Sequence, residues 1–379
     1  MHADIAIIGS GASGLTLAYR ISKSDLPKDL RIVIIDSEEK TRNDRTWCFW
    51  EKDPSIFESI VHSKWDNIIV KGENFSLNSN IEPFKYKCIR GIDFYNKTLA
   101  TLKEDDRFEF IKDTVDECEE KDEAVLLKLS SGECITANRV FNSVPKLNQS
   151  FHNVKYPTLN QHFIGWVVET EDYKFNTNEA TFMDFSIAQK GNTRFMYVLP
   201  YSENQALFEY TLFSEDLLKK EEYESEIKTY LKNLGINDYK IIEEEKGCIP
   251  MTAAPMEKGN SAKVTHIGTA GGWTKASTGY TFSNILKHTE SIVGQLSANK
   301  NPDIKLNNRY RFYDDILIDV LIRDNSRGAE LFTTLFKKRT PQSILSFLID
   351  EGNILDNLRL MSAMPMWHFT KAFFRRLKK

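Results

Sequence analysis

The first 36 residues alternate between two kinds of hydrophobic pattern. Apolar runs at 5–8 and 31–35 are each long enough for one buried strand. Between them, apolar residues recur every three or four positions from Leu15 to Ile21, which is typical of a helix. The sequence therefore predicts a strand, a helix and a second strand in this order.

The pattern changes further along the chain. Alternating runs with polar turns predict short strands over 60–92 and 108–141, with a helix over 94–103 between them. Residues 160–213 contain four apolar strands separated by short polar turns, which predicts an antiparallel meander. The last hundred residues are expected to be largely helical.

The turn after the first strand carries glycines at positions 9, 11 and 14. Gly9 permits a tight turn, Gly11 lets the backbone approach a pyrophosphate, and Gly14 lets the helix pack closely on the strand. Phosphates bind at the positive end of such a helix. Asp36, at the end of the second strand, can accept hydrogen bonds from a ribose hydroxyl. The unit predicts a bound dinucleotide, and the alternative is an ordinary glycine-rich turn.

A second glycine-rich loop covers 268–280, between a predicted strand at 264–267 and a predicted helix at 282–296. Such a loop can bring backbone N–H groups to the phosphates and ring edge of a flavin. Two separated glycine elements favour FAD over a lone NAD site, and the alternative is a loop that serves packing alone. The candidate cofactor-binding residues of this loop are Gly268, Gly271, Gly272, Thr278 and Gly279. Arg45 joins them from an aromatic segment at 43–50, which either lines a cavity or is a surface loop.

Composition narrows the function classes. Among 379 residues, 41% are hydrophobic, which is enough for a large core, and the net charge is −4. This charge argues against a general nucleic-acid binder. The five cysteines are scattered without metal-ligand spacing, so neither zinc nor a disulfide framework is expected, and reduced thiols in the cytoplasm are the simplest interpretation. No signal peptide and no membrane-spanning helix are expected.

Two carboxylates interrupt the apolar strands of the central region, Asp184 and Glu209. Glu209 shares a strand face with Leu207 and Thr211. If the strand at 194–200 lies between the other two, the backbones of the two acids are about 10 Å apart. A carboxyl facing an apolar cavity would keep its proton and become a general acid, whereas a carboxylate facing water would have little consequence.

The terminal segment 367–379 combines aromatic residues with five cations in its last nine positions. This composition predicts an interfacial helix on an anionic membrane. The alternative is a frayed basic tail.

With these residues in view, the chain resembles the lycopene cyclase family of FAD-dependent carotenoid enzymes, in its bacterial type, nearly from end to end. The specific matches are the segments 45–49, 182–185, 195–200, 208–211, 249–251, 268–272 and 277–280. Tyr210 follows Glu209 where plant-type enzymes have a second acid. Glu209 is therefore the acid of this pair of positions that could transfer a proton. Thr269 stands where related flavin hydroxylases place an aspartate, and the Trp-x-Trp pair of flavin halogenases is absent.

The resemblance implies lycopene beta-cyclase chemistry. An acyclic ψ end of lycopene or a related carotenoid is protonated, the carbocation closes a six-membered ring, and a proton is lost without net redox change. Glu209 is implied as the acid/base, Asp184 as a supporting carboxylate, and Trp47 and Tyr197 as aromatic faces for the cation. The implied cofactor is reduced FAD, with NAD(P)H as the reductant. The implied location is cytoplasmic, peripheral on the inner face of the membrane.

Two alternatives remain at this stage. One is a flavin-dependent monooxygenase or isoprenoid reductase on the same FAD fold, and the other is a carotenoid carrier without activity. The expected fold is α/β, with a Rossmann-like FAD-binding domain, an inserted antiparallel β-sheet substrate domain and a helical C-terminal region. The expected parts are FAD-binding 1–75, FAD-domain strands and connections 76–150, substrate sheet 151–245, FAD-binding 246–300 and helices 301–379.

Overall fold

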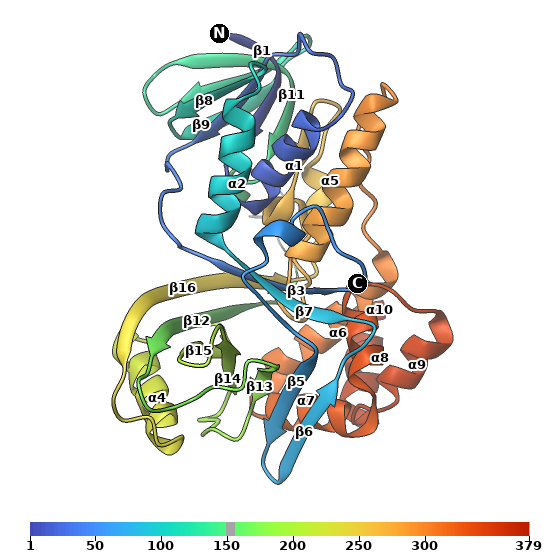
Figure 1. The fold of residues 1–379 in the computed structure, drawn as a ribbon. Helices are drawn as coiled ribbons and strands as arrows, with labels where there is room; N and C mark the ends of the chain where they lie inside the picture. The colour runs from blue at the N-terminus through green and yellow to red at the C-terminus, as the bar shows by residue number, and fades with distance from the viewer. Residues whose placement is uncertain (149–155, 379) are drawn as a thin grey trace.

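A computed structural model describes residues 1–148 and 156–378 of the protein (Figure 1). The predicted opening unit is present as β1 (His2–Ile8), α1 (Ala12–Ser22) and β2 (Ile32–Asp36). β1 pairs in parallel with β2 and with β11 (Cys134–Asn142). The first sheet has the order β8-β2-β1-β11-β10-β9, and β17 pairs with β11. Its remaining strands are β8 (Phe108–Lys112), β9 (Val115–Glu120), β10 (Val125–Leu129) and β17 (Val264–His266).

Three helices cover one face of this sheet, namely α1, α2 (Gly91–Lys103) and α5 (Phe282–Ser297) (Figure 1). The parallel strands are apolar on both faces because both faces are covered. Ile5 and Ile7 pack toward the helices, while Ala6 and Ile8 pack toward the opposite layer. This half of the molecule is the expected Rossmann-like unit.

The second sheet has the order β16-β12-β15-β14-β13-β5-β6. Its strands are β12 (Thr158–Glu169), β13 (Glu179–Asp184), β14 (Thr193–Pro200), β15 (Gln205–Ser214), β16 (Lys240–Thr252), β5 (Asn67–Gly72) and β6 (Phe75–Asn80). The strand at 194–200 does lie between the two acidic strands, as expected. The prediction of a simple antiparallel meander was wrong. β12 lies between β15 and β16 instead of beside β13, and β13 pairs in parallel with β5. Residues 67–80 therefore extend this sheet from the N-terminal part of the chain.

The two faces of the second sheet pack against different elements. Phe208, Tyr210 and Leu212 of β15 pack with α4 (Lys220–Asn233), whereas Leu207 and Phe213 pack with the C-terminal helices. Those helices are α6 (Asn308–Arg323), α7 (Gly328–Lys338), α8 (Pro341–Leu348), α9 (Ile354–Met361) and α10 (Met366–Leu377). Strand alternation places Glu209 on the same face as Leu207, as the sequence predicted.

A small third sheet joins the two halves (Figure 1). It contains β3 (Thr46–Glu51), β7 (Lys85–Arg90) and β4 (Ser63–Trp65), in the order β3-β7-β4. Trp50 Nε1 donates a hydrogen bond to the Leu345 carbonyl at 3.0 Å, which ties β3 to α8. The aromatic segment therefore forms a strand and not a surface loop, with Phe49 and Trp50 in the core and Arg45 exposed at its start.

The C-terminal helix α10 is held against α6 by ion pairs. Arg376 contacts Asp315 through Nε at 2.8 Å and Nη2 at 2.6 Å, and Arg375 Nε contacts Asp319 at 2.9 Å. Both aspartates are buried. Two of the five terminal cations therefore serve the fold. Among the described residues, no helix has the length and apolar character needed to cross a bilayer.

Candidate active site

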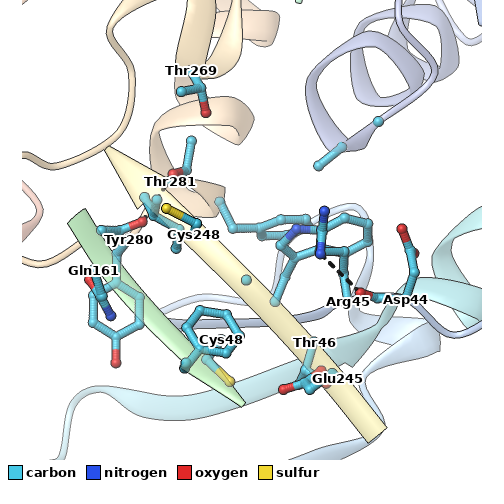
Figure 2. A pocket seen from close by; sticks show the side chains of 18 of the residues that line it. Asp44, Arg45, Thr46, Cys48, Gln161, Glu245, Cys248, Thr269, Tyr280 and Thr281 are labelled. Carbon is cyan, nitrogen blue, oxygen red and sulfur yellow. Dashed lines mark hydrogen bonds between the residues drawn. The ribbon is translucent and has the colours of Figure 1, made fainter. Parts of the chain in front are cut away.

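A cavity of about 790 Å³ runs from the nucleotide half to the second sheet (Figure 2). Gly11 and Asp36 line one end, and Glu209 and Tyr197 line the other. The structure thus connects the predicted nucleotide motif to the predicted acid through one space.

Gly9 and Gly14 of the first turn have the turn and packing geometry that the sequence predicted, and the role of Gly11 at a pyrophosphate stays a prediction. Gly9 has a φ of +91°, which favours glycine. A Cβ on Gly14 would lie 2.0 Å from the Gly9 carbonyl oxygen, so only glycine allows this approach of helix and strand. A Cβ on Gly11 would have no neighbour within 4 Å, so the backbone there faces open space at the helix N-terminus. Asp36 accepts hydrogen bonds from the Ser10 N–H at 2.6 Å and the Ser10 hydroxyl at 2.9 Å.

The second glycine loop is shaped by close packing. A Cβ on Gly268 would lie 2.0 Å from Ser13 Oγ, and one on Gly271 would lie 2.3 Å from the His266 carbonyl oxygen. Gly272 has a φ of +72°. Gly268 brings the loop against α1, whereas Gly271 packs on His266 and Gly272 on Met256. Thr269, Thr278 and Gly279 of the same segment line the cavity.

Two buried polar atoms on the cavity wall have no hydrogen-bond partner among the described residues. They are Thr278 Oγ1 and Gln161 Oε1. Buried polar groups are normally satisfied, so orphaned atoms on a cavity wall indicate a bound ligand. Together with the open space at Gly11 and the acid at Asp36, they fit a dinucleotide such as FAD.

Arg45 lies beside Asp44 just before β3 (Figure 2), and Trp47 of β3 also lines the cavity. Arg45 Nη1 donates to the Lys246 carbonyl at 3.0 Å and so joins β3 to β16. The Trp47 ring packs against Phe94 and Phe282, with centroid distances of 5.1 and 6.0 Å. The predicted Arg45 position at the cavity is confirmed by this geometry, and its contact with a cofactor stays a prediction.

At the other end, Glu209 is buried among aromatic residues. Tyr197 lies directly opposite it on β14, and Gly165 lies opposite it on β12. Gly165 is in turn opposite Glu245 on β16. The two glutamates therefore flank Gly165 on the same face of the sheet, close enough for each carboxyl group to act on the pKa of the other.

Each of these carboxyl groups also accepts a hydroxyl hydrogen bond. Thr211 Oγ1 donates to Glu209 Oε1 at 2.6 Å, and Thr46 Oγ1 donates to Glu245 Oε2 at 2.7 Å (Figure 2 shows Thr46 beside Glu245). Glu245 is partly exposed, and it lines the cavity.

Burial raises the pKa of Glu209 well above its usual range, and the neighbouring Glu245 carboxylate raises it further. Burial also raises the pKa of Glu245, against the hydrogen bond from Thr46. Each carboxyl group acts on the pKa of the other, as expected for two neighbouring acids that share one proton. Glu209 is the more buried of the two, which favours it as the group that keeps the proton.

Aromatic side chains form the wall around Glu209. The hydroxyl of Tyr86 is hydrogen-bonded to that of Tyr197 and lies 2.9 Å from that of Tyr280. Phe182 stacks on Tyr280 with a centroid distance of 6.1 Å. The cavity end is lined by Phe163, Phe182, Phe195, Tyr197, Phe213 and Tyr280. Such faces attract a cation through the ring quadrupole.

Asp184 does not join this site. Its carboxylate accepts hydrogen bonds from the Tyr230 hydroxyl at 2.7 Å and the Ser186 N–H at 2.9 Å, and Lys71 Nζ lies 3.6 Å away. The register of β13 shifts beyond Thr181, and such an irregularity re-aims the following side chains. Asp184 therefore faces α4, and its predicted support of Glu209 has no basis in the observed contacts.

A second, smaller cavity of about 80 Å³ lies among the C-terminal helices. It shares Phe182, Met183 and Thr278 with the main cavity. Most of its other lining is apolar and comes from α6 to α10, including Leu317, Phe336, Leu360 and Phe369. An apolar space thus adjoins the acid end of the main cavity.

Comparison with known families fits this geometry. The family model described as lycopene cyclase protein matches residues 4–373. The chain belongs to the lycopene cyclase family. The resemblance found in the sequence is thereby confirmed for nearly the whole chain.

Curated relatives of this cyclase-family chain come from plants. Chloroplastic lycopene beta cyclase of Arabidopsis thaliana is 24% identical over 310 residues, covering 75% of this chain and 58% of the relative. Chloroplastic neoxanthin synthase of Solanum lycopersicum is 24% identical over 295 residues, covering 73% and 57%. The chain spans less than two thirds of the length of these relatives.

Solved structures of flavoproteins share the fold. A geranylgeranyl bacteriochlorophyll reductase-like protein of Thermoplasma acidophilum has a TM-score of 0.63 at 11% identity, covering 98% of each chain. The flavin-dependent brominase Bmp2 has a TM-score of 0.60 at 14% identity, covering 100% of this chain and 98% of its own. The predicted α/β fold class, with a Rossmann-like part and a helical C-terminal region, is confirmed.

Sequence reasoning missed Glu245, Gln161 and Tyr280 as parts of the site. Glu245 belongs to the acidic run 243–245, which is typical of a solvated surface. The only local signal was that this run leads into the matched segment 249–251. Its place beside Glu209 depends on strand pairing across β12, which no local pattern encodes.

Proposed function

We propose that the protein is a FAD-dependent carotenoid cyclase that converts acyclic ends of lycopene or a related carotenoid into β-rings. The observation that supports this proposal is the buried Glu209 carboxyl, whose pKa is raised by burial, in an aromatic cavity that continues to a nucleotide motif. Membership of the lycopene cyclase family points to the same reaction class.

In the proposed reaction, Glu209 gives its proton to the terminal carbon–carbon double bond. The resulting carbocation closes a six-membered ring by forming one new carbon–carbon bond. A ring carbon then loses a proton, so substrate and product are isomers. An alkene is a very weak base, and a desolvated acid held against it by the cavity wall supplies the needed proximity.

The aromatic cavity wall would also stabilise the carbocation and keep water away from it. Tyr197, directly opposite Glu209, and the stacked Phe182 and Tyr280 present electron-rich faces to it. Trp47 lies farther along the same wall. Exclusion of water by these rings would prevent its addition to the cation.

The FAD in this proposal is held by the backbone at Gly11, by Asp36, and by Thr269 and Thr278 of the second loop. When bound in its reduced form, it supplies negative charge beside the cation. NAD(P)H is the proposed reductant.

The remaining polyene chain needs an apolar path of its own. The second cavity offers one, from Phe182 and Met183 toward α9 and α10. Beyond it, both helices expose large apolar residues, with Leu355 66% and Trp367 67% exposed. We therefore propose a peripheral contact with the membrane, on its cytoplasmic side, through which the lipid-soluble substrate reaches the cavity.

Glu209→Gln tests the reaction. It preserves shape but cannot deliver a proton, and loss of a general acid costs about 10²–10⁴-fold in rate. Cyclic product per enzyme is measured with lycopene and flavin reduced beforehand, so that loss of reduction is not mistaken for loss of chemistry. We expect at least about a 100-fold loss, with FAD and carotenoid binding retained.

Asp184→Asn is the matched control, because that carboxylate lies outside the cavity. It should retain most of the cyclisation rate. Absence of cyclic product from the unaltered protein would contradict the proposal. Consumption of NAD(P)H in proportion to product would instead indicate a monooxygenase or reductase.

A further inference from the structure

We infer that Glu209 and Glu245 have separate roles in proton transfer. Glu209 is the general acid that protonates the alkene, and Glu245 is the general base that removes the ring proton. This inference rests on the proposed cyclisation. It differs from a mechanism in which one carboxyl group gives the proton and takes it back.

The strand register is the first support. Glu209 on β15 and Glu245 on β16 flank the same residue of the central strand, Gly165. A Cβ on Gly165 would lie 3.3 Å from Glu209 Cβ and 3.2 Å from Glu245 Cγ. A side chain at this position would stand between the two acids, so glycine is what allows them to meet.

The hydrogen bonds of the pair are the second support. Thr211 donates to one oxygen of Glu209, and Thr46 donates to one oxygen of Glu245. This arrangement leaves the other oxygen of each group available to share a proton across Gly165. Two ionised carboxylates on neighbouring positions would repel, so one proton between them is favoured.

The groups around Glu209 differ from those around Glu245, which supports different roles for the two acids. Thr211 is the hydroxyl donor to Glu209, whereas the positive charge of Arg45 acts on Glu245, together with the negative charge of Glu243. The other titratable groups near the pair are Cys48, Cys88, Tyr201 and Tyr280, with Tyr197 opposite Glu209. Burial raises the pKa of each of these thiol and phenol groups, Cys88 included, so they stay neutral. Two acids with separated pKa values are the usual basis for an acid and base assignment.

The proton balance closes within the pair. Glu209 loses its proton to the alkene carbon, and the ionised Glu245 takes one from the ring carbon. The protonated Glu245 then passes its proton to Glu209 across Gly165. The ionised Glu245 also places negative charge beside the carbocation before it accepts the proton.

Glu245→Gln tests this division of roles. Without the base, cyclic product should fall by about 100-fold or more. The product mixture should also change, because a cation without its base loses a proton elsewhere or captures water. A purely structural role for Glu245 would lower the yield without changing the mixture.

Glu244→Gln is the matched control. Glu244 is the adjacent residue of β16, and it accepts hydrogen bonds from Trp166 Nε1 at 3.2 Å and Lys220 Nζ at 2.8 Å, away from the pair. It should retain the rate and product mixture of the unaltered protein. Gly165→Ala keeps both acids but separates them, so it should lower the rate as Glu245→Gln does.

Infrared spectroscopy measures the protonation of the Glu209–Glu245 pair in the absence of substrate turnover. The unaltered protein should show a protonated carboxyl band at neutral pH that disappears in Glu209→Gln and shifts in Glu245→Gln. A Glu245→Gln variant that keeps more than about a tenth of the rate, with the same product and an unshifted band, would overturn the inference. That result would leave the cyclase proposal standing, whereas an unaltered protein without cyclic product would not.

Discussion

The residues around Glu209 determine the pKa of its carboxyl group. A carboxyl group on a solvent-exposed strand would be ionised at neutral pH, but burial and the nearby Glu245 raise the pKa of Glu209 well above the ordinary value for glutamate. Its acidity is therefore a property of the strands around it. This link between protonation and burial has a consequence for stability.

The stability of the protein should fall as the pH rises from about 4.5, the ordinary value for glutamate, through the raised pKa of Glu209. In that interval the unfolded chain has released the proton while the folded protein still holds it, so raising the pH favours unfolding. Glu209→Gln should reduce this decline. Thermal unfolding of both proteins across the pH range measures it, and parallel curves would contradict the assigned shift.

At the same scale, the sequence predicted residues whose roles are local. The first-turn glycines and Asp36 belong to one continuous motif, and Glu209 is conspicuous on an apolar strand. The prediction that Asp184 supports Glu209 was wrong, because the irregular register of β13 turns the Asp184 side chain toward Tyr230. Glu245 was missed because its role exists only after β12 has paired with both neighbours.

At the scale of elements, hydrophobic periodicity predicted most strands and helices but not their neighbours. The opening strand, helix and strand form a local unit, so their pairing followed from the sequence. The second sheet draws β5 and β6 from residues 67–80, far from its other strands. Side-chain alternation cannot reveal such a long-range parallel contact.

The N-terminus of α1 provides a test of the cofactor site. Gly11→Val would project a branched side chain into the open space where a pyrophosphate is expected, so FAD retention should be abolished. Flavin absorbance after gel filtration measures it. Gly294→Val is the control, since that position on α5 also has no neighbour within 4 Å of a Cβ but lies outside the cavity lining. Full absorbance in both variants would refute the site.

At the scale of the whole molecule, many of the exposed large apolar residues lie on the two last helices. Ile354, Leu355 and Leu358 are exposed on α9, and Met366, Trp367 and Phe374 are exposed on α10. The same two helices wall the second cavity with Leu360 and Phe369. Because Arg375 and Arg376 are bound to aspartates of α6, apolar contact should contribute more to membrane binding than charge does.

The double substitution Leu355→Glu and Trp367→Glu should therefore weaken co-sedimentation with anionic vesicles strongly. Raised salt should weaken it less, since it screens only the remaining charges. Ile241→Glu is the control, because Ile241 is an exposed apolar residue on β16. Equal co-sedimentation of all three proteins would remove α9 and α10 from the membrane contact.

The small size of Gly165 has a consequence for how this family can diverge. A strand interior normally favours branched or aromatic residues, and glycine weakens it. We therefore expect selection to keep glycine here only in chains that keep both acids. A descendant that lost either glutamate would be free to gain a side chain at this position, so the three sites should vary together.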